Sequence, residues 1–159
     1  MDIILNKDTL YEKMSRSLSI IGKRSIDDNG KLLFADITLG TKEKEIANDF
    51  FRQAVIDLTT ELSVFITTAT SQSVAFTLNL PNNHNSALET FLQTACESYC
   101  VSYALYSWFV ITAPRISNKY ADDCKRTIAS VIRLAYDKKA PEGNNNMADI
   151  LSPTSTVTQ

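Results

Sequence analysis

The sequence predicts a mainly α-helical protein: a four-helix bundle-like domain with a short β-strand or hairpin element and an extended C-terminal tail. Two patterns support this fold class. Four long segments carry apolar residues three and four positions apart, as on one face of a helix, whereas residues 73–80 alternate between apolar and polar, as in a half-buried strand. The chain has 159 residues, of which 44% are hydrophobic, enough for one domain with its own core.

The first predicted helix begins at Thr9 and ends near Gly22. Thr9 and Glu12 have the spacing of a capping box, in which both side chains accept hydrogen bonds from free backbone N–H groups at the helix start. Glycine is common just after a helix C-terminus. Residues 23–41 form a connector, within which residues 32–39 are either a short strand or an extended crossing segment.

The second predicted helix runs from about Lys42 to Thr67, and residues 73–80 follow as a strand. A wide apolar stripe on the helix indicates burial against more than one neighbour. A single strand is not stable alone, so its partner must be residues 32–39 or a neighbouring subunit. The stripe consists of Ile46, Phe50, Ala54, Leu58, Leu62 and Phe65, and the apolar side of the strand consists of Val74, Phe76, Leu78 and Leu80.

The third and fourth predicted helices cover residues 86–111 and 117–136, with a sharp break at residues 112–114 between them. Ser86 and Glu89 again have the spacing of a capping box. The third helix is apolar nearly all round, so it should lie at the centre of the fold or contact a partner. We interpret its aromatic ladder as core and subunit-interface material. The ladder consists of Tyr99, Tyr103, Tyr106, Trp108 and Phe109.

The composition argues against several classes of function. A net charge of −2 gives no overall basic field for nucleic acid, and the four glycines do not cluster into a phosphate-binding loop. Three cysteines leave an odd count, which argues against a disulfide framework and fits a reducing compartment. No apolar run has the length of a membrane span. We therefore expect no cofactor and no contact with a membrane.

The residues that could carry chemistry are few and scattered. His84, the single histidine, lies in a turn without a nucleophile beside it in sequence, and we interpret it as a loop residue. Cys96 and Cys100 have a spacing that can supply two metal ligands, but core packing is the simpler interpretation. Asp122 and Asp123 point about 100° apart on a helix and do not converge. We expect neither a metal site nor an enzyme.

The order of these parts resembles the head–tail connector, or adaptor, proteins of tailed bacteriophages, small helical proteins that form a ring beneath the portal. The likeness lies in a long helix, residues 43–65, after a short helix and loop; in the aromatic helix end, residues 106–109; and in the last helix, residues 120–141, which ends in Pro141. It covers about residues 8–141. The strand and the long polar tail set the chain apart from the simplest members, so an adaptor, a neck-ring protein and a head-completion protein all stay open.

The resemblance implies a mechanical role in the virion, at the head–tail junction. Identical subunits would form a ring, expected to be a dodecamer, that joins the capsid to the tail and continues the portal channel. DNA would pass through without sequence-specific binding. The portal protein and tail or neck proteins would be the partners.

The resemblance also divides the chain and assigns its contacts. Residues 1–141 would be the connector domain and residues 142–159 a flexible or partner-bound tail. An open strand edge is a ready template for another chain, so the strand would pair across subunits. The tail would bind a partner through Met147, Ile150 and Leu151, and neighbouring subunits would meet at Val74, Phe76, Leu78 and Trp108. The alternative is a helical protein-binding or regulatory module without catalytic activity, with its site in a groove beside residues 99–109.

Overall fold

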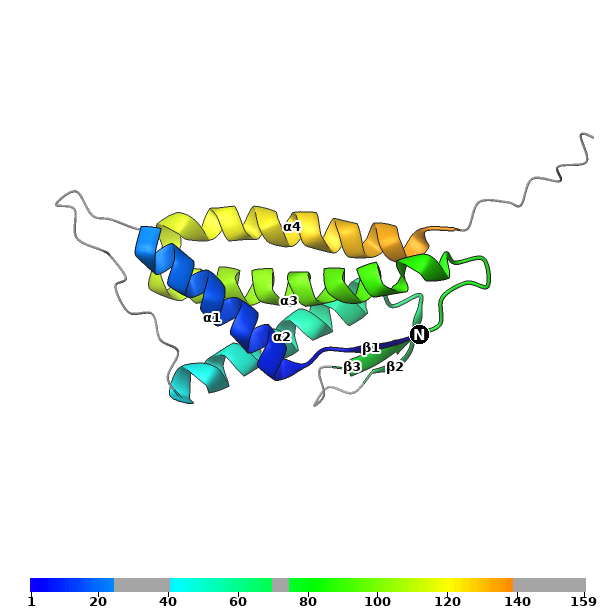
Figure 1. Ribbon diagram of the computed structural model, residues 1–159, viewed down its shortest axis with the longest axis horizontal. Helices are drawn as coiled ribbons and strands as arrows, with labels where there is room; N and C mark the ends of the chain where they lie inside the picture. Colours follow the sequence, from blue (N-terminus) through cyan, green and yellow to red (C-terminus); the bar gives the residue numbers. More distant parts are fainter. Residues whose placement is uncertain (25–40, 70–74, 139–159) are drawn as a thin grey trace, which may run out of the picture.

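The computed structural model describes residues 1–24, 41–69 and 75–138, and this part of the chain contains four long helices and one small sheet (Figure 1). The predicted fold class, mainly helical with a short β element, is confirmed. The segment 32–39 and the C-terminal tail with Met147, Ile150 and Leu151 lie outside the described residues.

The third helix along the chain, α3 (Glu89–Thr112), is the centre of the fold. Helices α1 (Lys7–Arg24), α2 (Thr41–Glu61) and α4 (Pro114–Tyr136) all pack against it, and α4 lies antiparallel along its length (Figure 1). An apolar surface nearly all round α3 allows burial from several sides at once, as predicted. Its buried residues are Leu92, Cys96, Tyr99, Cys100, Ala104, Leu105 and Phe109.

Helix α1 begins two residues earlier than predicted because Asn6 caps it. The side-chain oxygen of Asn6 accepts hydrogen bonds from the backbone N–H groups of Asp8 at 2.9 Å and Thr9 at 3.2 Å. Asparagine is as good an N-cap as threonine, and Thr9 already lies inside the first turn. The predicted capping box of Thr9 and Glu12 is therefore wrong, and the helix continues past Gly22 to Arg24.

Helix α2 ends at Glu61, earlier than the predicted Thr67, and a short strand, β2 (Ile66–Ala69), follows it. The chain turns between them, with the Phe65 N–H donating to the Leu62 carbonyl at 2.8 Å. The ring of Phe65 is buried edge-on against Tyr136 of α4, with 4.7 Å between ring centroids. β-Branched residues favour a strand directly after this turn, which the helical pattern concealed.

The predicted strand at residues 73–80 is observed as β3 (Ala75–Leu78), the middle strand of an antiparallel sheet in the order β1-β3-β2. Strand β1 (Asp2–Ile4) pairs with one edge of β3, and the Met1 ammonium donates to the Leu78 carbonyl at 2.8 Å. The partners of β3 are thus β1 and β2 of the same chain, which corrects the expected pairing with residues 32–39 or with a neighbouring subunit.

This sheet also corrects two of the residues expected at a subunit interface. The side chains of Phe76 and Leu78 lie in the core, 3% and 1% exposed. Both hydrogen-bonding edges of β3 are filled by β1 and β2, so β3 offers no free edge for another chain. Val74 lies outside the described residues.

The entry to α3 and the turn into α4 differ in detail from the prediction. A short 3-10 helix, η1 (Ser86–Leu88), precedes α3, and the side-chain oxygen of Asn85 caps it by accepting from the Ala87 N–H at 3.2 Å. The predicted capping box of Ser86 and Glu89 is therefore wrong. Helix α4 starts at Pro114, three residues earlier than predicted, because proline suits the first position of a helix.

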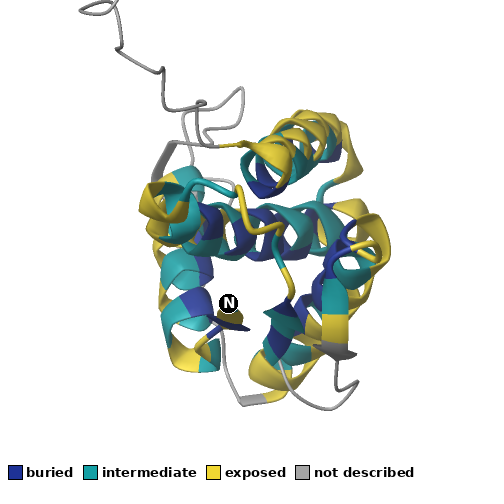
Figure 2. Ribbon diagram, turned by 90° about the vertical axis from the view of Figure 1, so that its right-hand side faces the viewer, coloured by how far each residue is buried: buried dark blue, intermediate teal, exposed yellow. Residues whose placement is uncertain are grey.

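The core is one continuous cluster that joins the helices to the inner face of the sheet (Figure 2). On α2 the buried face is centred on Ala47, Phe51 and Leu58, each 0% exposed. Ile46, which the predicted stripe placed inside, is 44% exposed. The apolar pattern on α2 therefore identified the helix but placed its inner face about one residue out of register.

Candidate protein-binding groove

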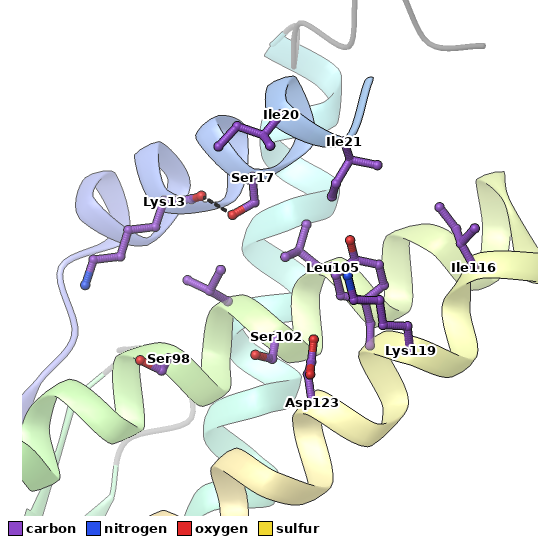
Figure 3. Close-up of a pocket in the computed structure, with 12 residues that line it drawn as sticks. Lys13, Ser17, Ile20, Ile21, Ser98, Ser102, Leu105, Ile116, Lys119 and Asp123 are labelled. Atoms are coloured by element: carbon purple, nitrogen blue, oxygen red, sulfur yellow. Dashed lines mark hydrogen bonds between the residues drawn. The ribbon is translucent and has the colours of Figure 1, made fainter. Parts of the chain in front are cut away.

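A groove of about 590 Å³ lies between α1, α3 and α4. Helices α1 and α4 both pack on α3 but make little contact with each other, so the surface of α3 between them stays open. Figure 3 shows side chains from all three helices around this space. We call it the α1/α3/α4 groove. Its lining consists of Lys13, Ser17, Ile20, Ile21, Ser98, Val101, Ser102, Leu105, Ile116, Lys119, Tyr120 and Asp123.

The floor of the groove is one face of α3, because Ser98, Val101, Ser102 and Leu105 are three and four residues apart. Two serines on an otherwise apolar helix leave the floor low between larger neighbours. The Ser98 hydroxyl is engaged within its own helix, where it donates to the Thr94 carbonyl at 2.8 Å. The floor therefore offers mainly apolar surface.

The α1 wall of the groove is held by a polar chain that runs to the sheet. The Lys13 ammonium forms an ion pair with Glu97 of α3, whose side chain is 19% exposed. The side-chain amide of Gln93 donates both to Glu97 at 3.3 Å and to the Ile4 carbonyl of β1 at 2.7 Å. These contacts fix α1, α3 and β1 relative to one another, so the groove is built on a firm frame.

The α4 wall carries one cation without a partnered carboxylate. Asp123 forms an ion pair with Arg126 one turn further along α4. In the described part of the chain, no carboxylate lies within ion-pair distance of Lys119, whose ammonium is 5.8 Å from the centre of the Tyr120 ring. Figure 3 shows Lys119 extending from α4 toward Leu105. Burial, and then the charge of Asp123, raise the pKa of the Tyr120 hydroxyl.

The aromatic ladder lies on a neighbouring face of α3. Tyr99 and Tyr103 are 6.1 Å apart between ring centroids, and Tyr103 and Tyr106 are 6.5 Å apart. Burial is the main cause that raises the pKa of Tyr99 and Tyr103, and the charge of Asp57 on α2 adds to it. The ladder thus faces α2, and the groove lies beside it, on the face of Ser98 and the residues in register with it.

The two cysteines of α3 belong to the core, as expected. Cys96 and Cys100 are both 0% exposed, and burial raises the pKa of the Cys96 thiol to about 12. Cys124 of α4 is partly buried, and burial raises its pKa to about 12 as well. No group of three His, Cys, Asp or Glu side chains in the described residues could hold a metal ion.

His84 lies in the turn before α3, as predicted, but its surroundings are unusual. Its backbone forms a β-bridge with Lys138, just after α4. Both ring nitrogens are shielded from solvent and have no hydrogen-bond partner. The turn is thereby joined to the end of α4, and no residue with a catalytic role in sequence reasoning accompanies it.

Of the residues expected to meet partners, Trp108 alone lies partly exposed on the described surface. It is partly buried and packs against the core, so its role at a subunit interface stays a prediction. Sequence reasoning missed the groove residues Lys13, Ser98, Ser102 and Lys119. The signal for them was small: two serines four positions apart on an otherwise apolar helix.

Comparison with protein-family models, with curated proteins and with solved structures finds no match to this chain. None of the helices in residues 1–24, 41–69 and 75–138 is long and apolar enough to cross a membrane. The resemblance to connector proteins therefore stays a prediction.

Proposed function

We propose that this protein is a structural assembly component that binds a protein segment in the α1/α3/α4 groove. The observation that carries the proposal is the groove itself: an apolar floor between two helical walls, with charged side chains at its rim. Protein-binding sites commonly combine an apolar centre with a polar rim, and helical domains often take a partner segment in such a groove.

The surroundings of the groove suit recognition of a protein segment. Val101, Leu105 and Ile116 supply apolar surface, while Ile20 on the α1 wall is 48% exposed and would lose that exposure under a bound segment. Burying an isoleucine side chain fully contributes about 1.5–3 kcal/mol. The Lys13–Glu97 ion pair holds the wall in place before binding, which reduces the entropy lost on association.

The specific form that we propose is a ring subunit at the head–tail junction of a tailed bacteriophage. The support is the resemblance of residues 8–141 to the connector proteins. Identical subunits would join head to tail into a closed ring, the geometry that arises when a groove and its complement lie on different parts of one chain. The portal protein and tail or neck proteins would bind above and below, and DNA would pass through the channel.

The test is the mass of the purified protein, alone and with a portal protein, together with electron micrographs. We expect rings or a stable portal complex for the wild type. The Ile20→Asp variant should lose assembly, because a charge would enter the apolar groove. Ile46→Asp is the matched control, since Ile46 is 44% exposed and lies on α2, away from the groove. Equal assembly by both variants would show that the groove does not carry it.

The second candidate is a helical protein-binding or regulatory module that does not form rings. The volume of the groove favours it, because about 590 Å³ lies within the range of sites that enclose a small ligand or a few side chains. A protein that stays monomeric with the portal present, but retains binding in the groove, would support this candidate over the ring.

A further inference from the structure

We propose that residues 147–151 of the same chain occupy the α1/α3/α4 groove and cover it until a partner displaces them. The inference rests on the proposed function of the groove as a protein-binding site and adds the regulation of that site. Three arguments carry it: the chemistry of the segment, its reach, and the high local concentration of an attached ligand.

The chemistry of the segment matches the groove. The tail from Glu142 onward is polar except for Met147, Ile150 and Leu151, which are gathered within five residues around Asp149. The groove offers an apolar floor for the three apolar side chains. Lys119 at its rim has no carboxylate partner among the described residues, and Asp149 would provide one.

The reach of the chain also fits. Helix α4 ends at Tyr136, and the nearest groove residue on this helix is Asp123, thirteen residues earlier, a distance of about 20 Å at 1.5 Å per residue. The residues between helix and segment, 137–146, include one glycine and three consecutive asparagines. A flexible linker of ten residues has a root-mean-square length of about 17 Å, and full extension gives about 33 Å.

A linker whose average length matches the span gives the highest effective concentration, which reaches the millimolar range for short flexible linkers. The attached segment would therefore fill the groove even if its affinity as a separate peptide were weak. A partner with higher affinity, or present at high local concentration in an assembly, would displace it. The segment would thus keep isolated subunits from associating prematurely.

The first experiment measures binding of a fluorescein-labelled peptide of residues 142–159 to the full-length protein by fluorescence anisotropy. We expect the peptide to bind the full-length Ile150→Asp variant at least tenfold more tightly than the wild type, because the attached segment competes only in the wild type. Val157→Asp is the matched control: it adds the same charge to the tail outside the segment and should behave like the wild type.

Three results would overturn the proposal. Equal affinity of the wild type and Ile150→Asp would show that the attached tail does not cover the groove. Absence of binding to both would show that this segment is not the occupant. A difference that disappears when the wild type is diluted would assign the occupied groove to a neighbouring copy instead of the same chain.

A second experiment places the contact by disulfide trapping in the full-length Ile20→Cys, Ile150→Cys variant. A cross-link within one chain gives a faster-migrating monomer on a non-reducing gel, whereas a cross-link between copies gives a dimer. We expect the monomer; a dimer, or no cross-link, contradicts the proposal. Each single-cysteine variant is the control for the native thiols, of which Cys96 and Cys100 are buried.

These measurements separate this inference from the proposed function. Rings formed by a wild type that binds the peptide as tightly as Ile150→Asp would leave the assembly role intact and remove the covering segment. A tenfold difference in a protein that forms neither rings nor a portal complex would keep the covering segment and remove the assembly role.

Discussion

The two buried thiols of α3 should make the fold unstable at alkaline pH. Burial raises the pKa of Cys96 from 9.0 to about 12, and burial likewise raises that of Cys100. In the unfolded chain both thiols return to their ordinary pKa. Below pH 9 they are protonated in both states, so the contribution to stability is fully present. Above pH 9 only the unfolded chain loses these protons, and stability falls until the folded thiols ionise as well.

The size of the effect follows from the pKa of 9.0 in the unfolded chain. At pH 10 each thiol that stays protonated in the folded state stabilises the unfolded state by RT ln 11, roughly 1.4 kcal/mol. At pH 8 the same expression gives less than about 0.1 kcal/mol. Between these two pH values the pair therefore lowers the free energy of unfolding by about 2.7 kcal/mol, a large share of the stability of a typical domain.

The assay is urea unfolding at pH 8 and pH 10 under reducing conditions, followed by far-UV circular dichroism. The control is the Cys96→Ala, Cys100→Ala variant, which has no thiols on α3. It should be less stable at pH 8 because of the cavity, but its loss between pH 8 and pH 10 should be about 2.7 kcal/mol smaller than that of the wild type. The same loss in both proteins would refute the reasoning. If the double variant does not fold, Cys96→Ala alone should show half of the difference.

Three further predictions concern stability and use the same unfolding assay. Asn6→Ala should cost about 1 kcal/mol by removing the cap of α1, while Thr9→Ala should cost less, since Thr9 does not act as the cap; the reverse order would restore the capping box. Phe109→Ala should cost about 3–5 kcal/mol because the ring is 1% exposed, whereas Ile111→Ala, at a site 70% exposed, should stay within about 0.5 kcal/mol; similar losses would contradict the assigned core. Glu97→Gln should cost less than about 1 kcal/mol, because its lysine partner on α1 is 43% exposed, and the loss should shrink at high salt; a larger or salt-independent loss would contradict this.

Much of the secondary structure could be predicted because helices and strands depend on local spacing. The position of α3 at the centre followed from its apolar surface, and the burial of Cys96 and Cys100 followed from their place on that helix. The helix ends were less certain, because several residues in each turn region can cap. Asn6 and Asn85 cap where Thr9 and Ser86 were expected, since the cap that forms depends on where the preceding chain enters.

The sheet could not be predicted from any local segment. Strand β1 is three residues long, and it pairs with a strand more than seventy residues away. The end of α2 was likewise set by a distant contact, the packing of Phe65 on Tyr136. Such pairings depend on which surfaces the helices leave open, so they appear only when the helices are packed.

The sequence by itself determined a helical domain with one alternating strand and a polar tail that carries a short apolar segment, because these properties are written in residue spacing and composition. The tertiary structure alone decided where the domain is open. The α1/α3/α4 groove exists because α1 and α4 both pack on α3 and leave the face of Ser98 and Ser102 uncovered between them. A groove is a property of three surfaces brought together, and no single segment of the chain contains it.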